Sequence, residues 1–340
     1  MRCYTRWSAA AAQRWSDEVL ILETLAQAMA PMLGNAPAPQ TVSAAAQRAL
    51  QNLPNAAAPE DLIAHRALCA RVQLELGTVQ LDRHRVRMQE AVIAGVPVRI
   101  FTPAEIPAEN RARVLLNLHG GGFTVDAGSV TENVPVAAYT RMTVIAARYR
   151  LAPEHPFPAA VDDAEAVFNA LLGEHTGDQI GLYGTSAGAC LCAQLLVRLT
   201  FAGRPLPHAF GFFTGTADLS RSGDSEFFFR PANDRVSNAD QFAAYVGNCD
   251  RLSPSVSPIF SDLKGFPPTL CIAGTRDFML SQTSLFHQAL LHSGVDARLL
   301  IFEAMPHAHW IFLDLPESDQ TFRAMAAFFT SRFALGDRRP

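Results

Sequence analysis

One segment, IGLYGTSAG at residues 180–188, decides the fold prediction. Residues 180–183 form a short apolar run typical of a buried strand, and residues 187–201 have the composition of a helix. Between them stands a G-x-S-x-G pattern, in which a sharp strand-to-helix turn requires residues without bulk two places before and after the serine. Such a turn lifts the Ser186 hydroxyl above the edge of a sheet, although the pentapeptide also occurs by chance. The pattern therefore needs support from other segments.

A second segment, HGGGF at residues 119–123, follows directly after the apolar run at residues 114–118. Glycine N–H groups can approach a developing oxyanion closely because no side chain is in the way. A nucleotide-binding loop fits poorly, since no G-x-G-x-x-G pattern or Walker lysine follows. We therefore predict an oxyanion hole made by the N–H groups of Gly121, Gly122 and Ala187. His119 is expected to shape this loop rather than to act as a base.

A serine nucleophile needs a base and an acid that orients the base. In folds where a G-x-S-x-G turn joins a strand to a helix, both residues follow the serine in the chain. The acid comes first and the histidine second, each at the carboxyl end of a later strand. The predicted strand at residues 269–273 leads to Asp277, which is our candidate acid. Glu303 and Asp262 are rivals, but Glu303 ends the histidine's own strand and Asp262 lies before its strand begins.

Two histidines follow the last predicted strand, residues 297–302. His307 and His309 both lie in the loop after this strand. The pattern of strands and loops indicates only that one of them is the base.

The chain around these motifs alternates strands and helices, which predicts a mostly parallel sheet with helices on both faces. A hairpin with Gly95 in its turn is expected before this alternation begins. Residues 1–78 are predicted to form a helical cap that ends near Gly77, and residues 79–340 the catalytic domain. Residues 217–266 interrupt the alternation and are expected to contribute to the cap. Further predicted elements are a strand at 144–147, a helix at 159–172, a strand at 209–213, and helices at 283–292 and 319–333.

Composition narrows the function classes. The chain has 340 residues and a net charge of −4, which argues against nucleic acid as a main partner. Every apolar stretch is interrupted before it reaches membrane-spanning length, so membrane insertion is not expected. The six cysteines show neither a CxxC pattern nor zinc spacing, so no metal site or disulfide framework is predicted. Polar residues 13–18 break the pattern of a signal peptide, and we expect a cytoplasmic protein.

Taken together, residues 119–123, 149–160 and 184–188 resemble the hormone-sensitive lipase family of α/β-hydrolases. The block YRLAPEHPFPAA at residues 149–160 is a long and specific match, and the resemblance covers roughly residues 80–330. In the family a methionine stands two residues before the catalytic histidine, as Met305 stands before His307. The resemblance therefore selects His307 over His309. At the position of His309 the family more often has an aromatic or aliphatic residue. The GTSAG elbow resembles the branch with Thr before the serine.

The resemblance implies an α/β-hydrolase fold and hydrolysis of short- to medium-chain carboxylic esters without a cofactor. It further implies a lid made by the N-terminal helices and a homodimer through an exposed sheet edge. Phe123 and Trp310 are candidates for the substrate pocket, with ordinary core packing as the alternative. Other reactions of the same triad are those of an amidase, an arylformamidase or a deacetylase. A non-catalytic ligand receptor, as in the gibberellin receptors that resemble this family, is disfavoured because serine, acid and histidine are all present.

Overall fold

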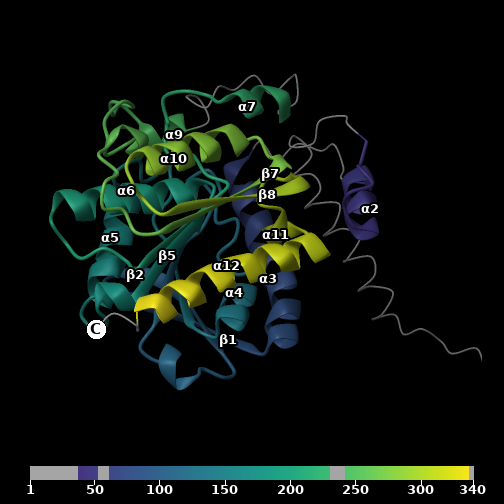
Figure 1. Ribbon diagram of the computed structural model, residues 1–340, viewed down its shortest axis with the longest axis horizontal. Helices are drawn as coiled ribbons and strands as arrows, with labels where there is room; N and C mark the ends of the chain where they lie inside the picture. Colours follow the sequence, from purple (N-terminus) through teal and green to yellow (C-terminus); the bar gives the residue numbers. More distant parts are fainter. Residues whose placement is uncertain (1–36, 53–60, 230–241, 337–340) are drawn as a thin grey trace, which may run out of the picture.

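The structure, a computed structural model, describes residues 37–52, 61–229 and 242–336 (Figure 1). Its centre is an eight-stranded sheet with the order β1-β2-β4-β3-β5-β6-β7-β8. β2 is antiparallel to both of its neighbours, and all pairs from β4 to β8 are parallel. The strands are β1 (Val86–Ile93), β2 (Val96–Pro103), β3 (Val114–Leu118), β4 (Thr143–Ala147), β5 (Ile180–Thr185), β6 (Ala209–Phe213), β7 (Thr269–Arg276) and β8 (Ala297–Pro306).

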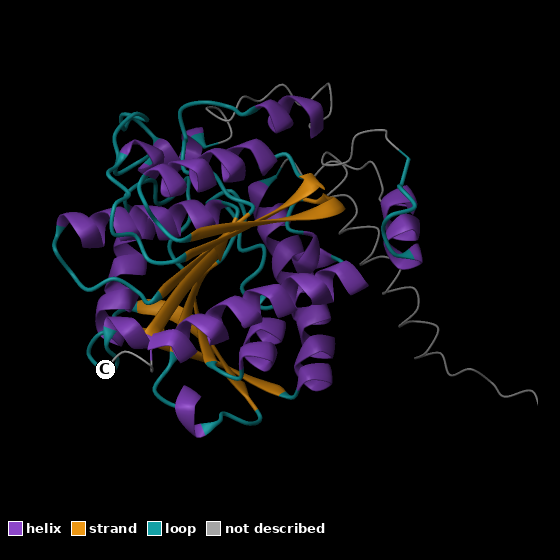
Figure 2. Cartoon of the chain, in the orientation of Figure 1, coloured by secondary structure: helices purple, strands orange, loops and turns teal. Residues whose placement is uncertain are grey.

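Helices cover both faces of this sheet (Figure 2). The α-helices are α2 (Ala44–Asn52), α3 (Leu62–His84), α4 (Asn133–Thr140), α5 (Ala159–Leu171), α6 (Ala187–Phe201), α7 (Asp224–Phe229), α9 (Ala243–Val246), α10 (Leu280–His292), α11 (His309–Phe312) and α12 (Pro316–Gly336). Short 3-10 turns are η2 (Ala108–Asn110), η3 (Gly177–Gln179) and η4 (Pro258–Phe260). No helix in the described ranges is long and apolar enough to cross a membrane.

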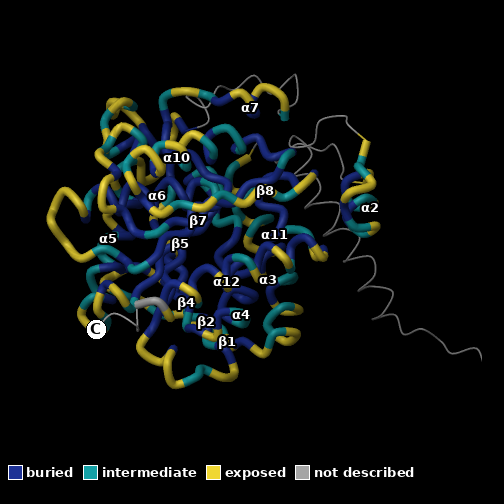
Figure 3. Tube along the Cα trace, viewed as in Figure 1, coloured by how far each residue is buried: buried dark blue, intermediate teal, exposed yellow. Residues whose placement is uncertain are grey.

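The two largest clusters of buried apolar residues lie on opposite sides of the sheet. The buried segments run through the centre of the molecule (Figure 3). Leu116 and Leu118 of β3 pack with α5, α6 and α10, whereas Leu115 packs with α4 and α12. This alternation follows from the two-residue period of a strand. Because both faces are covered, β3, β5 and β6 are buried along their whole length. The mostly parallel sheet with helices on both faces is thus confirmed.

The sequence prediction was wrong at the end of the N-terminal helices. α3 does not end near Gly77 but continues to His84, where Arg85 adopts a left-handed conformation and caps the helix. Gly77 is buried inside α3, and a Cβ there would lie 2.4 Å from Val130 Cγ1. The glycine therefore marks a close approach between α3 and the following chain, not a helix end. Residues 1–36 and 53–60 of the predicted cap lie outside the described residues.

The excursion at 217–266 contains only short helices in its described part, namely α7, α9 and η4. Tyr245 of α9 stacks on Phe123 with ring centroids 3.6 Å apart. The excursion therefore packs against the glycine-rich loop that follows β3. Helix α4 was not predicted, and β7 and β8 extend several residues beyond their predicted ends.

Candidate active site

The G-x-S-x-G segment forms the predicted sharp turn between β5 and α6. Ser186 has φ 58° and ψ −121°, a conformation that non-glycine residues rarely adopt. A Cβ on Gly184 would lie 2.3 Å from the carbonyl oxygen of Gly188, and one on Gly188 would lie 1.9 Å from that of Leu118. Both glycines are therefore required by the closeness of the backbone. The turn places Ser186 at the carboxyl edge of the sheet.

The glycine-rich loop lies against the serine. A Cβ on Gly120 would be 3.2 Å from Ser186 Cβ, so the loop passes directly beside the nucleophile elbow. Gly121 and Gly122 have φ values of 116° and 61°. A Cβ on Gly121 would lie only 2.1 Å from the Val125 carbonyl oxygen, which leaves no room for another residue.

The carbonyl groups of this loop are held by hydrogen bonds. The Gly120 oxygen lies 2.8 Å from His119 Nδ1 and accepts a bond from Ala127 N at 3.2 Å. The Gly121 oxygen accepts bonds from the backbone N–H groups of residues 124 and 125, both at 3.0 Å. In a trans peptide the C=O of one residue and the N–H of the next point in opposite directions. Fixing these two carbonyls therefore fixes the N–H groups of Gly121 and Gly122.

His119 has a structural role in this loop, as predicted from the sequence. Its ring is buried and stacks on Tyr149 with centroids 4.2 Å apart. The Tyr149 hydroxyl donates a 2.6 Å hydrogen bond to the His119 carbonyl oxygen. Ala187, the third candidate donor, is the first residue of α6, where N–H groups have no partner within the helix.

The structure brings Asp277 and His307 together. Asp277 follows β7 and His307 follows β8, and His307 Nδ1 lies 2.8 Å from Asp277 Oδ1. Both side chains are buried. Since a carboxylate only accepts hydrogen bonds, Nδ1 carries the proton and Nε2 keeps a free lone pair. This is the tautomer that a general base requires.

Two consecutive residues at the end of β6 connect the serine with the histidine. The Phe213 carbonyl oxygen accepts a 2.9 Å hydrogen bond from Ser186 N. Thr214 Oγ1 lies 3.0 Å from His307 Nδ1. Thr214 has a positive φ of 46° and was missed by the sequence analysis, because no local motif marks it. The end of β6 thus places the nucleophile elbow beside the Asp277–His307 pair.

The rival residues lie elsewhere. His309 opens α11, is completely buried, and its Nε2 lies 3.0 Å from Thr321 Oγ1 of α12. Burial lowers the pKa of His309 to about 3. Glu303 and Asp262 are exposed, and the Asp262 carboxylate accepts a hydrogen bond from the backbone of Lys264 at 2.9 Å. The geometry therefore separates His307 from His309, which the pattern of strands and loops did not.

Glu132 is a second residue that the sequence analysis missed. Its carboxylate is completely buried at the end of the glycine-rich loop. It accepts hydrogen bonds from Trp310 Nε1 at 2.9 Å, from Asn117 Nδ2 at 3.2 Å and from the Thr185 hydroxyl. Burial raises the pKa of Glu132, while these three donors act in the opposite direction. One carboxylate thereby joins β3, the residue before Ser186 and helix α11, which follows His307.

The two candidate pocket residues are buried. Phe123 has no exposed surface and stacks on Tyr245. Trp310 is 1% exposed, and its ring meets Phe213 edge-on at 6.3 Å. Trp310 is also one of the residues that line a cavity of about 400 Å³ between α3 and α12. Their contacts are those of packing residues, Phe123 in the glycine-rich loop after β3 and Trp310 in the chain after β8.

Comparison with known proteins finds relatives with the same fold. The α/β-hydrolase fold family matches residues 115–311. An acetyl-hydrolase of Streptomyces hygroscopicus is 32% identical over 238 residues, covering 68% of this chain and 79% of the relative. Carboxylesterase NlhH of Mycobacterium tuberculosis is 29% identical over 255 residues, covering 69% and 78%. Among solved structures, esterase E25 has a TM-score of 0.76 at 30% identity, covering 87% of this chain and 96% of its own. An esterase from the bacterial hormone-sensitive lipase family has a TM-score of 0.73 at 28% identity, covering 81% and 93%.

Proposed function

Since this chain belongs to the hormone-sensitive lipase family of α/β-hydrolases and is a carboxylesterase, we propose that Ser186, His307 and Asp277 are its catalytic triad. The observation that carries the assignment is the buried 2.8 Å contact between His307 Nδ1 and Asp277 Oδ1, beside the elbow that holds Ser186. A histidine so oriented presents Nε2 as a general base.

Acylation begins when His307 Nε2 takes the proton of the Ser186 hydroxyl. The serine oxygen bonds to the ester carbonyl carbon, and the carbonyl oxygen takes up the negative charge. The N–H groups of Gly121, Gly122 and Ala187 donate hydrogen bonds to this oxyanion. His307 then gives its proton to the departing alkoxide, so that an alcohol leaves and an acyl-serine remains. Asp277 stabilises the imidazolium that forms between these two proton transfers.

Deacylation repeats the sequence with water. His307 Nε2 takes a proton from water, and the resulting hydroxide bonds to the acyl carbon. The same N–H groups stabilise the second oxyanion. Collapse of this intermediate returns the proton to Ser186 and releases the carboxylic acid. The mechanism uses no metal or cofactor.

The substrates we propose are short- to medium-chain carboxylic esters. The names of two relatives support this class, one an acetyl-hydrolase and the other a carboxylesterase. We also propose that residues 1–78 and 217–266 cover the site of the catalytic domain at 79–340. The stacking of Tyr245 on Phe123 supports this arrangement, because it places the excursion on the oxyanion loop. A cytoplasmic location and a homodimer are predictions from the sequence.

Covalent labelling tests the triad directly. A fluorophosphonate should modify the native chain on Ser186, as located by peptide mass spectrometry, and should leave Ser186→Ala unmodified. His307→Ala should react far more slowly, because its serine lacks a base. A folded native chain that stays unmodified, or is modified at another serine, would contradict the assignment.

A further inference from the structure

One face of α3 runs along the outside of the oxyanion loop. Arg66, Gln73 and Gly77 are spaced by seven and then four residues, so they project from the same side of the helix. Arg66 Nε donates a 2.7 Å hydrogen bond to the Thr124 carbonyl oxygen. Gly77 lets the helix approach Val130 so closely that a Cβ would lie 2.4 Å from its side chain. The helix therefore touches both ends of the segment that follows the glycines.

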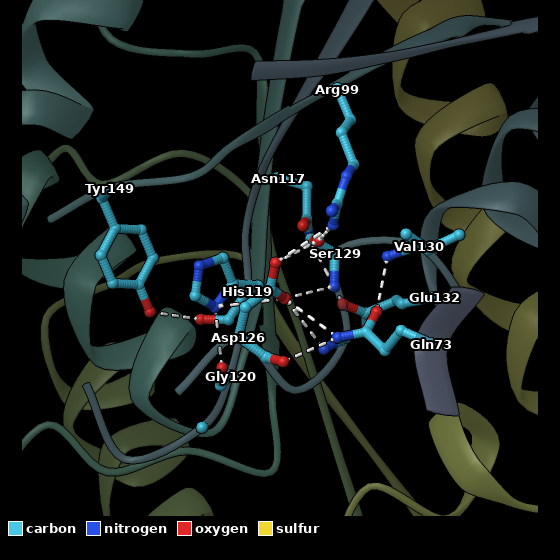
Figure 4. Close-up of polar contacts among 12 residues, drawn as sticks. Gln73, Arg99, Asn117, His119, Gly120, Asp126, Ser129, Val130, Glu132 and Tyr149 are labelled. Atoms are coloured by element: carbon cyan, nitrogen blue, oxygen red, sulfur yellow. Dashed lines mark hydrogen bonds and ion pairs between the residues drawn. The ribbon is translucent and has the colours of Figure 1, made fainter. Parts of the chain in front are cut away.

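Gln73 makes the most specific of these contacts (Figure 4). Its side chain is 3% exposed. Nε2 donates to the Asp126 carbonyl oxygen at 2.8 Å and to Asp126 Oδ1 at 3.0 Å, while Oε1 accepts from Val130 N at 2.8 Å. One amide thus connects two points of the loop that are four residues apart. An apolar side chain of the same length could make none of these bonds.

Asp126 connects Gln73 with the glycine-rich segment. Its carboxylate accepts hydrogen bonds from Ser129 N at 3.0 Å and from the Arg99 guanidinium of β2 at 3.2 Å. It also lies 3.8 Å from Nδ1 of His119, the nitrogen that bonds the Gly120 carbonyl. Burial opposes ionisation, but His119, Ser129 and Arg99 together hold the pKa of Asp126 well below its usual range. The ionised carboxylate is the hub between α3, β2 and the oxyanion loop.

Arg66 adds a second connection at the other end of the face. Its guanidinium donates to the Ala152 carbonyl oxygen at 2.8 Å and forms a two-pronged ion pair with Glu154 at 2.7 Å. The same side chain therefore ties the segment around residue 124 to the segment around residues 152–154. An exposed ion pair by itself adds little stability, so the geometric role outweighs the energetic one.

We propose that Gln73 and Arg66 are positioning residues that hold the oxyanion loop in its catalytic conformation, so that α3 is a working part of the oxyanion hole as well as part of a cap. The inference rests on the proposed ester hydrolysis. It reaches the Gly121 N–H through the Gly120 carbonyl, which His119 and Ala127 hold. It reaches the Gly122 N–H through the Gly121 carbonyl, which the backbone of residues 124 and 125 holds. A loop free to shift would offer its N–H groups less often in the direction of the oxyanion.

The test compares Gln73→Met and Arg66→Met with the same substitutions at Gln80 and Arg71. Gln80 lies on α3 facing the cavity near α12, and Arg71 is exposed on α3. With 4-nitrophenyl butyrate, kcat of Gln73→Met should fall at least about tenfold, short of the ~10² to 10³ lost with a whole oxyanion donor. Arg66→Met should fall less, and Arg66→Lys should recover part of the loss. Both controls should stay within about twofold of the native kcat, as expected for substitutions that leave the transition state untouched.

The affinity for a trifluoromethyl ketone distinguishes a positioning role from a merely structural one. The ketone forms a hemiketal with the serine whose oxyanion occupies the same hole, so its affinity should fall by the factor lost in kcat/KM. KM for the ester should change little. If Gln73→Met does not fold, Gln73→Glu serves instead, since it keeps the acceptor for Val130 N but sets a carboxylate beside Asp126.

Two results would overturn the inference. One is native kcat in a folded Gln73 variant, and the other is a loss of kcat with unchanged affinity for the ketone. The proposed function fails separately, and would be recognised by native hydrolysis that survives in Ser186→Ala.

Discussion

Thr214 Oγ1 lies 3.0 Å from His307 Nδ1, the same nitrogen that lies 2.8 Å from Asp277 Oδ1. Two oxygen atoms, one from the segment after β6 and one from the segment after β7, therefore lie within hydrogen-bonding distance of the same imidazole nitrogen. The residue before Thr214 accepts a hydrogen bond from Ser186 N. The end of β6 is thus a structural link between the nucleophile and the base.

Thr214→Val tests how much the Thr214 hydroxyl contributes to kcat/KM. Valine keeps the branched shape but removes the oxygen, and Asp277 still orients the ring. Losing one hydrogen bond of about 1 kcal/mol should lower kcat/KM by roughly two- to tenfold. Thr214→Ser should retain most of the activity because it keeps the hydroxyl. Equal losses in both variants would show that packing, not the oxygen, is what His307 requires.

Asp277→Asn should be far more damaging. The amide can donate to Nδ1 and so favours the tautomer in which Nε2 carries the proton and cannot act as a base. A drop of about 10⁴ in kcat is expected. Steady-state kinetics with 4-nitrophenyl butyrate measure it. A loss below about tenfold would point to another acid.

Gly121→Ala should disable the oxyanion hole. The new Cβ would meet the Val125 carbonyl oxygen at 2.1 Å, and φ is 116°, so the loop must move. We expect kcat to fall by about 10² or more, as for removal of an oxyanion donor. Gly95→Ala is the matched control, since Gly95 also has a positive φ but a Cβ there would meet nothing within 4 Å. Near-native kcat in Gly121→Ala would exclude this loop from the oxyanion hole.

Glu132→Gln should weaken the contacts that connect β3, the nucleophile elbow and α11. Three donors converge on the carboxylate, and the amide NH₂ of glutamine would face one of them without an acceptor. The free energy of unfolding should fall by about 1–3 kcal/mol, as measured by urea denaturation at pH 7. The exposed Glu90→Gln should change it by less than about 0.5 kcal/mol. If both variants unfold alike, Glu132 is not a structural hub.

The buried His309 makes stability depend on pH. Its folded-state pKa of about 3 lies below the usual 6.5, so the unfolded chain takes up the proton first. This contribution is complete above pH 6.5 and is lost as the pH falls toward 3. By pH 5 the loss relative to high pH amounts to about 2 kcal/mol, because its slope approaches roughly 1.4 kcal/mol per pH unit below pH 6.5.

His309→Phe should remove this dependence. Urea denaturation at pH 7.5 and pH 5 should show a smaller difference in the free energy of unfolding for the variant than for the native chain. Equal differences would contradict a neutral buried His309. Ester hydrolysis should survive the substitution, because the proposed base is His307.

The parts of the site that sequence could predict are those marked by contiguous residues. The elbow needs glycines at fixed places, and the oxyanion loop needs three in a row, so both are visible in a single chain. Asp277 was found because it follows a recognisable strand. His307 could be separated from His309 only by the family's Met-x-His pattern or by geometry, since both lie in the same loop.

Other parts depend on contacts between distant segments. Thr214, Glu132 and Gln73 have ordinary local sequences, and their partners lie about 50 residues or more away for the most important contacts. Gly77 misled the prediction for the same reason. Its lack of a side chain serves the approach to Val130, whereas a helix end would have required a left-handed conformation that Arg85 supplies instead.

The most direct measurement is hydrolysis of 4-nitrophenyl acetate, butyrate, octanoate and palmitate by the native chain, Ser186→Ala, His307→Ala and His309→Phe, with folding of each variant checked by circular dichroism. We predict that the native chain and His309→Phe cleave the shorter esters, while Ser186→Ala and His307→Ala fall to background. A native chain inactive on every ester, or a folded Ser186→Ala variant that keeps native activity, would contradict the account.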